Sequence, residues 1–164
     1  MRLGLQISCE LEQVKTLRPK SDGSFNWCLK VKCGSCGTED PTWHQVSESD
    51  ADQYSDVQGD VNFHMKCKFC KRPGFIDVVK GSSKEYTEDD SGKFKTIVSF
   101  TCKGIEPFQF AFEGGWEVKC LDSNTTFEDV DLSDDWVEFD GKSQLPVGIS
   151  ETKSQFVREP ENKK

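Results

Sequence analysis

The sequence predicts an all-β protein, and three observations lead to that prediction. Short segments in which apolar and polar residues alternate recur along the chain, and this is the pattern of half-buried strands. Gly, Pro, Asn and Asp residues, which favour turns, separate these segments. Finally, the sequence has no stretch with a sustained apolar period of 3.6 residues, so it predicts no amphipathic helix.

The first half of the chain contains most of the expected strands. The clearest covers residues 25–32, where Phe25, Trp27 and Leu29 alternate with more polar residues. Residues 16–23 hold Pro19 and Gly23 and are expected to form a turn. The expected strands of this half are residues 5–15, 25–32, 43–47, 61–65 and 75–79.

The second half contains two expected strands, residues 94–101 and 117–121. Residues 121–140 carry eight acidic side chains and no basic one, and the shorter segment 47–60 is also acidic and has no basic residue. Such runs are most simply solvated surface, although a basic partner is a sharper alternative. The charged tail after about residue 157 is expected to fray.

A faint internal repeat suggests how the chain is organised. Trp27 is followed by Val31-Lys32-Cys33, and Trp116 is followed by Val118-Lys119-Cys120, each pair after a similar proline-containing segment. Repeated β units would produce this pattern. We therefore expect an N-terminal β lobe at residues 1–80, a hydrophilic linker at 81–93, and a C-terminal lobe at 94–164 that duplicates the first without its CxxC pairs.

Composition excludes several classes of function. The net charge of −8 disfavours binding to nucleic acid or to an anionic membrane surface. Apolar runs are too short for a transmembrane helix, and the N-terminus lacks the apolar stretch of a signal peptide. We therefore expect a protein of the cytoplasm, or of the nucleus, where its eight cysteines stay reduced.

Four of those cysteines have the spacing of metal ligands. Cys33 and Cys36 form one CxxC pair, and Cys67 and Cys70 form another. Four thiolates bind one Zn²⁺ ion as a tetrahedron, and such a closed shell is typical of structural rather than catalytic zinc. The sequence therefore predicts one zinc ion per chain, in the N-terminal lobe. Lysines beside both pairs would offset the negative charge of the thiolates, although they could instead form a small phosphate-binding patch.

Other residues offer weaker alternatives. The two pairs could be independent redox sites, but the βαβ setting of such sites is absent from the pattern. His64 lies close enough to Cys67 to replace a ligand, whereas we expect His44 to point out of a strand. The remaining cysteines lack partners at ligand spacing and behave as small apolar residues, with Cys28 on the polar side of its strand. These cysteines are Cys9, Cys28, Cys102 and Cys120.

Several motifs together resemble the eukaryotic CXXC motif-containing zinc-binding protein family, over roughly residues 3 to 157. The matching motifs are Leu17-Arg18-Pro19, Phe25-x-Trp27-x-Leu29-Lys30-x-Lys32-Cys33-Gly34-x-Cys36-Gly37, Lys66-Cys67-Lys68-x-Cys70-x-Arg72, and Phe94-Lys95-Thr96-Ile97-Val98-x-Phe100-x-Cys102-x-Gly104-x-Glu106-Pro107. The resemblance implies an elongated molecule of two similar lobes related by a pseudo-twofold axis. It also implies one zinc held by Cys33, Cys36, Cys67 and Cys70, and it supplies no catalytic residue to carry over.

The function that these observations favour is a zinc-stabilised scaffold or adaptor that binds another protein as a monomer. A metal-handling protein, which would exchange zinc or copper at reachable thiolates, is the alternative. An enzyme is a third possibility, but no catalytic constellation is visible in the sequence, so we predict none.

Overall fold

The computed structural model describes residues 1–55, 57 and 59–160 and confirms an all-β protein. In that part of the chain the only helix is the short 3-10 turn η1, Glu88–Asp90, and no helix is long and apolar enough to cross a membrane. The strands of the first half are β1 Arg2–Glu12, β2 Val14–Pro19, β3 Trp27–Cys33, β4 His44–Val46, β5 Asp52–Gln53, β6 Asp60–Val61, β7 Phe63–Lys66 and β8 Pro73–Val78. The others are β9 Tyr86–Thr87, β10 Lys95–Lys103, β11 Ile105–Ala111, β12 Trp116–Cys120, β13 Thr126–Val130, β14 Trp136–Asp140 and β15 Leu145–Glu159.

Several of these strands differ from the sequence-based expectation. The expected turn at 16–23 begins as strand β2, because the chain bends at Gln13, whose φ is +56°, and continues as a second strand. The acidic run 121–140 contains β13 and β14 rather than loop alone. Strand β15 continues through Arg158 and Glu159, where we expected fraying, because both residues pair with β1.

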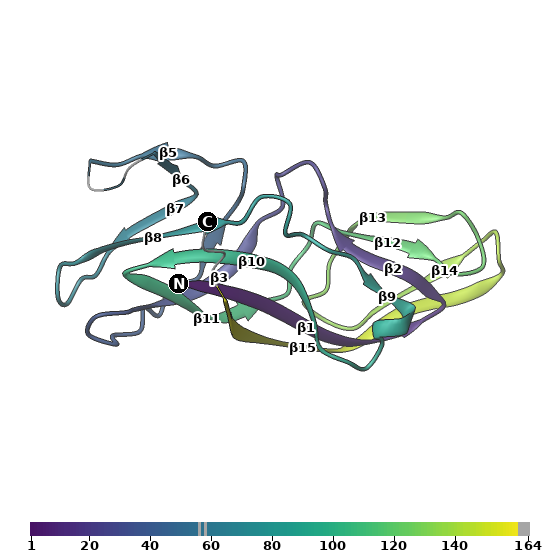
Figure 1. The fold of residues 1–164 in the computed structure, drawn as a ribbon. Helices are drawn as coiled ribbons and strands as arrows, with labels where there is room; N and C mark the ends of the chain where they lie inside the picture. Colours follow the sequence, from purple (N-terminus) through teal and green to yellow (C-terminus); the bar gives the residue numbers. More distant parts are fainter. Residues whose placement is uncertain (56, 58, 161–164) are drawn as a thin grey trace.

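The described residues form four sheets, and the molecule is elongated (Figure 1). The central six-stranded sheet has the order β14-β15-β1-β10-β8-β7. A four-stranded sheet, β13-β12-β2-β9, and a three-stranded sheet, β11-β3-β4, accompany it, and β5 pairs with β6. Neighbouring strands of the central sheet pair antiparallel.

The pairing pattern is that of a duplicated unit with a pseudo-twofold relationship. Exchanging each strand of the first repeat with its counterpart in the second reproduces the order of the central sheet in reverse. The counterparts are β1 and β10, β2 and β11, β3 and β12, β4 and β13, β7 and β14, and β8 and β15. The same exchange converts the β11-β3-β4 pairing into β2-β12-β13. The repeat expected from the tryptophans is therefore present in the topology. The sheets nevertheless combine strands from both halves of the chain, and the division into lobes 1–80 and 94–164 stays a prediction.

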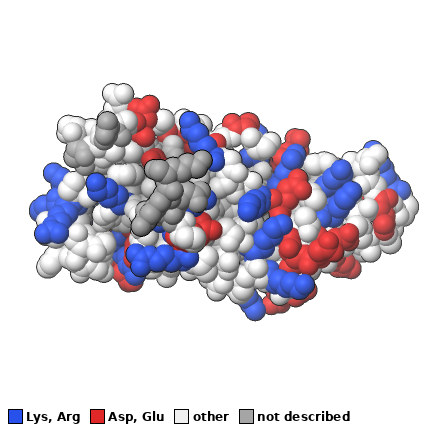
Figure 2. Space-filling model, in the orientation of Figure 1, with Lys and Arg blue, Asp and Glu red and all other residues white. Residues whose placement is uncertain are grey.

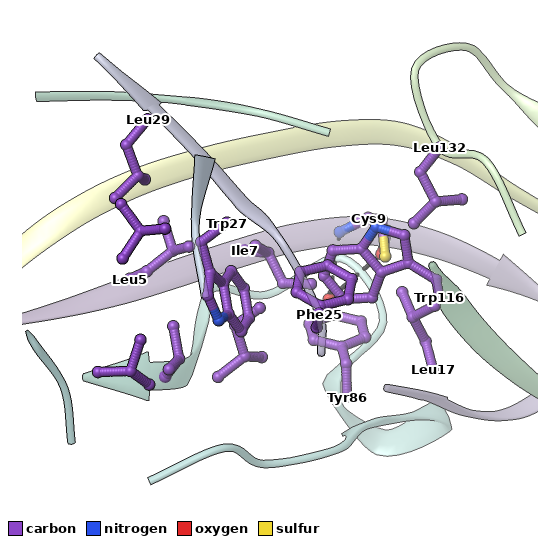
Figure 3. Close-up of a cluster of buried hydrophobic side chains, with 14 of the residues drawn as sticks. Leu5, Ile7, Cys9, Leu17, Phe25, Trp27, Leu29, Tyr86, Trp116 and Leu132 are labelled. Atoms are coloured by element: carbon purple, nitrogen blue, oxygen red, sulfur yellow. Dashed lines mark hydrogen bonds between the residues drawn. The ribbon is translucent and has the colours of Figure 1, made fainter. Parts of the chain in front are cut away.

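The core lies where the two repeats meet. Trp27 and Trp116, which begin the equivalent strands β3 and β12, are both buried, with ring centroids 6.2 Å apart. Phe25 packs edge-on against both indoles, at 4.5 and 5.0 Å (Figure 3). Aromatic pairs in this geometry contribute about 0.5–1.5 kcal/mol each beyond their burial. The aromatic residues that suggested the repeat thus join its two copies.

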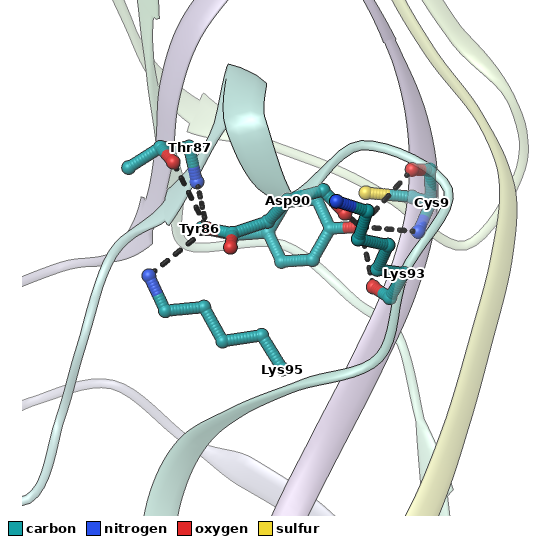
Figure 4. A network of polar contacts seen from close by, with 6 residues as sticks. All are labelled: Cys9, Tyr86, Thr87, Asp90, Lys93 and Lys95. Carbon is teal, nitrogen blue, oxygen red and sulfur yellow. Dashed lines mark hydrogen bonds and ion pairs between the residues drawn. The ribbon is translucent and has the colours of Figure 1, made fainter.

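The segment 81–93, expected to be a hydrophilic linker, is attached to the core by a buried tyrosine. Tyr86 of β9 is fully buried, and its hydroxyl accepts a hydrogen bond from the Cys9 amide at 3.3 Å (Figure 4). The same hydroxyl lies within donating distance of the carbonyl oxygens of Cys9, Asp90 and Lys93. Asp90 in turn accepts hydrogen bonds from Thr87 and Lys95. These contacts order a segment whose composition alone suggested a loose connection.

Candidate metal centre

Two turns at the same end of the molecule carry the predicted ligands. Cys33 is the last residue of β3, and Cys36 follows it in the turn that leaves the strand. Cys67 follows β7 directly, and Cys70 lies in the turn that leads to β8. Because β3 and β8 are separate in sequence but both lie beside the β10–β11 bend, their turns can meet there.

A close backbone contact between glycines holds the two turns together. The Gly34 amide donates a hydrogen bond to the Gly104 carbonyl at 2.8 Å, and Gly104, with a φ of +76°, forms the bend between β10 and β11. Gly74, at the start of β8, packs on the other side of this bend. A Cβ atom on Gly74 would lie only 2.7 Å from the Ile105 nitrogen and the Lys103 oxygen. Glycine is therefore required where the start of β8, just after the second turn, approaches the β10–β11 bend.

The four sulfur atoms are arranged as a metal site requires. All four lie within 4.8 Å of one another, and no other group of potential ligands of this kind is found among the described residues. The Sγ atoms of Cys33 and Cys70 are 3.6 Å apart, and those of Cys36 and Cys67 are 3.7 Å apart. Zinc–sulfur bonds of roughly 2.3 Å in a tetrahedron put the sulfurs roughly 3.8 Å apart. The arrangement can therefore hold one zinc ion.

Backbone amides surround the sulfur atoms. The amides of Ser35 and Cys36 point to Cys33 Sγ at 3.4 and 3.5 Å, and the Cys70 amide points to Cys67 Sγ at 3.4 Å. Such N–H groups stabilise thiolate charge. The second turn achieves this without a glycine at the place of Gly37, because Lys71 itself takes a φ of +66°.

The thiols differ in burial and in acidity. Cys33 and Cys67 are buried, Cys70 is half-buried and Cys36 is exposed. Hydrogen bonding with the Thr38 hydroxyl and amide lowers the pKa of Cys36 to about 6, and the Cys36 amide lowers the pKa of Cys33. The Arg72 amide acts in the same direction on Cys70, but desolvation and the neighbouring thiols outweigh it and raise the pKa of Cys70 to about 11. Cys36 is thus more acidic than Cys70.

Basic side chains flank the cluster, as expected from the sequence. Arg72 connects the two turns by donating a hydrogen bond from Nη1 to Ser35 Oγ at 3.4 Å, and Lys32 forms an ion pair with Glu106. Lys and Arg side chains gather at the end of the molecule that carries the β7–β8 turn (Figure 2). Thr38 is the contributor that was not expected from the sequence, where its only signal is its position two residues after Cys36.

The other cysteines lie apart from this cluster. All eight cysteines lie among the described residues and are free thiols. Burial raises the pKa values of Cys9 and Cys102 to about 12 and that of Cys28 to about 11, so these thiols stay protonated. The expectation for Cys28 was wrong: it is buried, because neighbouring structure covers both faces at the start of β3.

The two histidines do not join the sulfur atoms. The ring of His64 stacks on Tyr54 with centroids 4.0 Å apart, and His44 in β4 is half-buried against Phe63. The metal-binding group among the described residues contains neither of them. The expectation that His44 points away from its strand is thus only partly met.

Comparison with known proteins gives consistent matches over nearly the whole chain. Residues 4–157 match the family described as "CXXC motif containing zinc binding protein, eukaryotic". The Drosophila melanogaster protein "UPF0587 protein CG4646" is 46% identical over 96% of this chain and 98% of its own length. The Homo sapiens "CXXC motif containing zinc binding protein" is 36% identical over 96% and 98%.

Two solved structures share the fold. The structure titled "Crystal Structure of C1orf123" superposes with a TM-score of 0.91 at 36% identity, covering 96% of this chain and 99% of that one. A "Hypothetical protein from plasmodium falciparum" superposes with a TM-score of 0.85 at 23% identity, again over 96% and 99%. At that lower identity the second match supports the fold alone.

Proposed function

Because this chain belongs to the family of eukaryotic CXXC motif containing zinc binding proteins, we propose that Cys33, Cys36, Cys67 and Cys70 bind one zinc ion and that the protein is a zinc-stabilised scaffold for another protein. The spacing of the sulfur atoms is the observation that carries the first part of the proposal. Distances of 3.6 and 3.7 Å across the two turns match a tetrahedral tetrathiolate zinc site.

A structural role follows from the donor set. Four thiolates fill the coordination sphere of zinc, which leaves no open position for a substrate or a reactive water molecule. The ion joins two turns that are separated by 30 residues of chain between Cys36 and Cys67. Metal binding in such a site contributes directly to the free energy of folding.

Metal content tests the ligand assignment. Native mass spectrometry of the wild-type chain should give one zinc ion per molecule, and Cys67→Ser should lose the ion and lower the melting temperature. Cys28→Ser makes the same chemical change at a buried cysteine outside the cluster, and it should retain the metal. A Cys67→Ser variant that keeps its zinc would contradict the assignment.

The surface around the site supports a binding role. Phe69, between the two ligands of the second turn, is 77% exposed. Exposed residues Lys68, Lys71 and Arg72 flank it. A large exposed aromatic side chain among cations is typical of a contact residue at a protein interface. We propose that this surface, residues 66–72, is where the partner docks, and we expect the partner's surface to be acidic.

Affinity capture from cells can separate this binding role from folding. We expect a partner to be recovered with the wild type and to be lost with Phe69→Ser, a variant that should keep its zinc and its melting temperature. Val137→Ser, at a 72% exposed position outside the surface 66–72, is the matched control and should retain the partner. If Phe69→Ser and Val137→Ser capture the same proteins as the wild type, the docking assignment is wrong.

One observation favours a second candidate function, metal handling. Cys36 is exposed and Cys70 is half-buried, so two of the four cysteines are not fully enclosed. Exposed thiolates permit ligand exchange with a chelator or with a metal-carrying partner. Competition with a chelator decides between the candidates: retention of zinc for hours supports the structural role, and release within minutes supports metal handling.

A further inference from the structure

The same exchange of strands relates the two cysteine turns to two turns at the opposite end of the molecule. The turn after β3, residues 33–38, corresponds to the turn after β12, residues 120–125. The turn between β7 and β8 with its flanking residues, 67–73, corresponds to the turn between β14 and β15 with its flanking residues, 140–146. The strands β7 and β14 form the two outer edges of the central sheet (Figure 1).

Backbone hydrogen bonds of the first pair of turns confirm this correspondence. The Cys33 amide donates to the Thr38 carbonyl at 2.9 Å, and the Cys120 amide donates to the Thr125 carbonyl at 2.9 Å. The next residue in each turn then donates to the bend of the other repeat. These two bonds run from Gly34 to the Gly104 carbonyl at 2.8 Å and from Leu121 to the Gln13 carbonyl at 3.0 Å.

The second pair of turns agrees equally well. The Lys71 amide donates to the Cys67 carbonyl at 2.9 Å, and the Gln144 amide donates to the Asp140 carbonyl at 2.9 Å. Lys71 and Gln144 also share a left-handed backbone, with φ values of +66° and +61°. A proline follows two residues later in both turns, at 73 and 146.

This register assigns a counterpart to each cysteine ligand. Cys33 corresponds to Cys120, which retains the thiol, whereas the other three ligands are replaced. The replacements are Ser123 for Cys36, Asp140 for Cys67 and Ser143 for Cys70. Thr38, which contacts the Cys36 thiol, has its counterpart in Thr125.

The replaced residues form a closed hydrogen-bonded cluster around one carboxylate. Asp140 is fully buried, and both of its oxygens are occupied. Ser123 and Ser143 donate to Oδ2, and Thr125 Oγ1 donates to Oδ1 at 2.8 Å. The Lys142 amide donates to Oδ1 at 3.0 Å. Donors from both turns therefore converge on Asp140, as both turns of the other repeat converge on a shared site.

We propose that residues 120–125 and 140–146 are a metal-independent counterpart of the zinc site, in which the buried Asp140 carboxylate replaces the ion as the group that joins the two turns. The inference rests on the proposed zinc site for its comparison. It follows that the native chain holds metal at one end and not at the other. It also follows that three substitutions, Ser123→Cys, Asp140→Cys and Ser143→Cys, complete a second tetrathiolate site with Cys120.

The chemistry explains why one carboxylate can stand where an ion would. Zinc holds its turns together by accepting electron pairs from four thiolates, and the carboxylate does so by accepting hydrogen bonds from four donors. Charged acceptors form stronger hydrogen bonds than neutral ones, and buried carboxylates are stable when fully bonded. The hydroxyl groups of Ser123 and Ser143 donate to Asp140, and zinc is bound in proteins by thiolates, imidazoles and carboxylates rather than by neutral hydroxyls.

Measuring zinc in the variant with all three substitutions tests the proposal. Zinc per chain should rise by one, from one to two in the otherwise wild-type chain. In a Cys33→Ser, Cys67→Ser background the same three substitutions should raise it from zero to one, so a failure of the proposed native site is distinguished from a failure of this inference. Ser123→Ala, Asp140→Ser and Ser143→Ala, combined as the matched control, should add no zinc. A folded three-cysteine variant with no additional zinc would overturn the correspondence.

Amide hydrogen exchange of the wild-type protein gives an independent test that requires no variant. When a chelator removes zinc, the amides of Cys33 and Lys71 should lose protection by tenfold or more. Their counterparts, the amides of Cys120 and Gln144, should keep their protection within about twofold. Equal loss of protection at both ends would show that the second pair of turns depends on metal, and it would overturn the proposal.

Discussion

Lys71 gives the second cysteine turn the backbone conformation it needs, at a cost in conformational energy. Its φ of +66° places it in the left-handed region, which costs a non-glycine residue roughly 1–2 kcal/mol. The equivalent position of the first turn is occupied by Gly37, whose φ is +76°. The second turn has Lys71 where the first has Gly37, and the sequence does not reveal that a lysine there takes the same left-handed backbone.

We predict that Lys71→Gly stabilises the protein. Relief of the left-handed strain should add about 1 kcal/mol, less the extra entropy of glycine in the unfolded chain. In a domain of this size that change raises the melting temperature by about 2–4 °C, which differential scanning calorimetry can measure. Lys71→Ala removes the same charge but keeps the strain, so it should show no increase. An unchanged or lower melting temperature for Lys71→Gly would contradict the prediction.

Asp140 predicts how stability depends on pH. Hydrogen bonds from Ser123, followed by those from Ser143 and Thr125, hold the pKa of this carboxyl well below its usual range. Its contribution is therefore complete above the pKa of an unfolded Asp, about 3.9, and is lost as the pH falls toward the lower folded value. Asp140→Asn should be less stable than the wild type at pH 7, and the difference should shrink below about pH 4.

Urea unfolding between pH 3 and pH 7, in the presence of a chelator, measures this effect without the release of zinc by acid. Asp122→Asn removes an exposed carboxylate from the turn before Thr125 and controls for the loss of negative charge. A difference between the wild type and Asp140→Asn that is constant over this pH range would show that the carboxylate does not titrate as described.

At the scale of strands, local sequence predicted those with a clear alternation of apolar residues and missed others, among them β11, β13, β14 and β15. β3 and β10 were found because apolar residues alternate over several positions. β14 was missed because it is an edge strand in which Val137, Glu138 and Phe139 are all exposed, so no alternation marks it. β13 was missed for a similar reason, and Asp129 interrupts it with a φ of +53°. Both strands pair with a neighbour in sequence, β13 with β12 and β14 with β15, so it is the exposure of their side chains that hides them from local patterns.

Contacts between elements also position the metal turns, and Gly74 tests this. A methyl group at Gly74 would lie 2.7 Å from backbone atoms of the β10–β11 bend, and backbone cannot move aside easily. We expect Gly74→Ala to destabilise the protein by about 1–3 kcal/mol, the usual cost of overpacking. Because β8 follows the second turn, we also expect weaker zinc retention in a chelator competition.

Gly114→Ala is the matched control, since an added Cβ there meets nothing within 4 Å. This control should retain wild-type zinc affinity and change stability by no more than about 0.5 kcal/mol, as is usual for surface substitutions. Normal zinc retention and stability in Gly74→Ala would mean that the close approach of β8 and the bend does not determine the positions of the turns.

At the scale of the whole molecule, the sequence indicated the repeat but not how its copies combine. Trp27 and Trp116 marked equivalent strands, and the resemblance to a family implied the pseudo-twofold relationship. The clustering of Cys33, Cys36, Cys67 and Cys70 was also expected from their spacing alone, because a metal-binding turn favours that spacing locally. The pairing of strands between the two halves of the chain was not predictable, since β2 pairs with β12 and β3 pairs with β11 across a long separation in sequence.

Because strands pair between the two halves, we predict that neither half of the chain folds alone. In fragment 1–80, β1 would lack both of its partners, β10 and β15, and β3 would lack β11. The indole of Trp27 would also lose Trp116. Unpaired strand edges and an exposed aromatic core cannot offset the entropy of ordering the chain. We therefore expect fragments 1–80 and 81–164 to be unfolded separately and to form one folded complex when mixed.

Circular dichroism and the dispersion of amide proton resonances measure whether each fragment is folded. Zinc is present throughout, so that a lack of metal does not limit folding of the cysteine turns. A separately folded fragment 1–80 that binds zinc would show that metal and local strands suffice, and that the pairing between halves joins two units that are already formed.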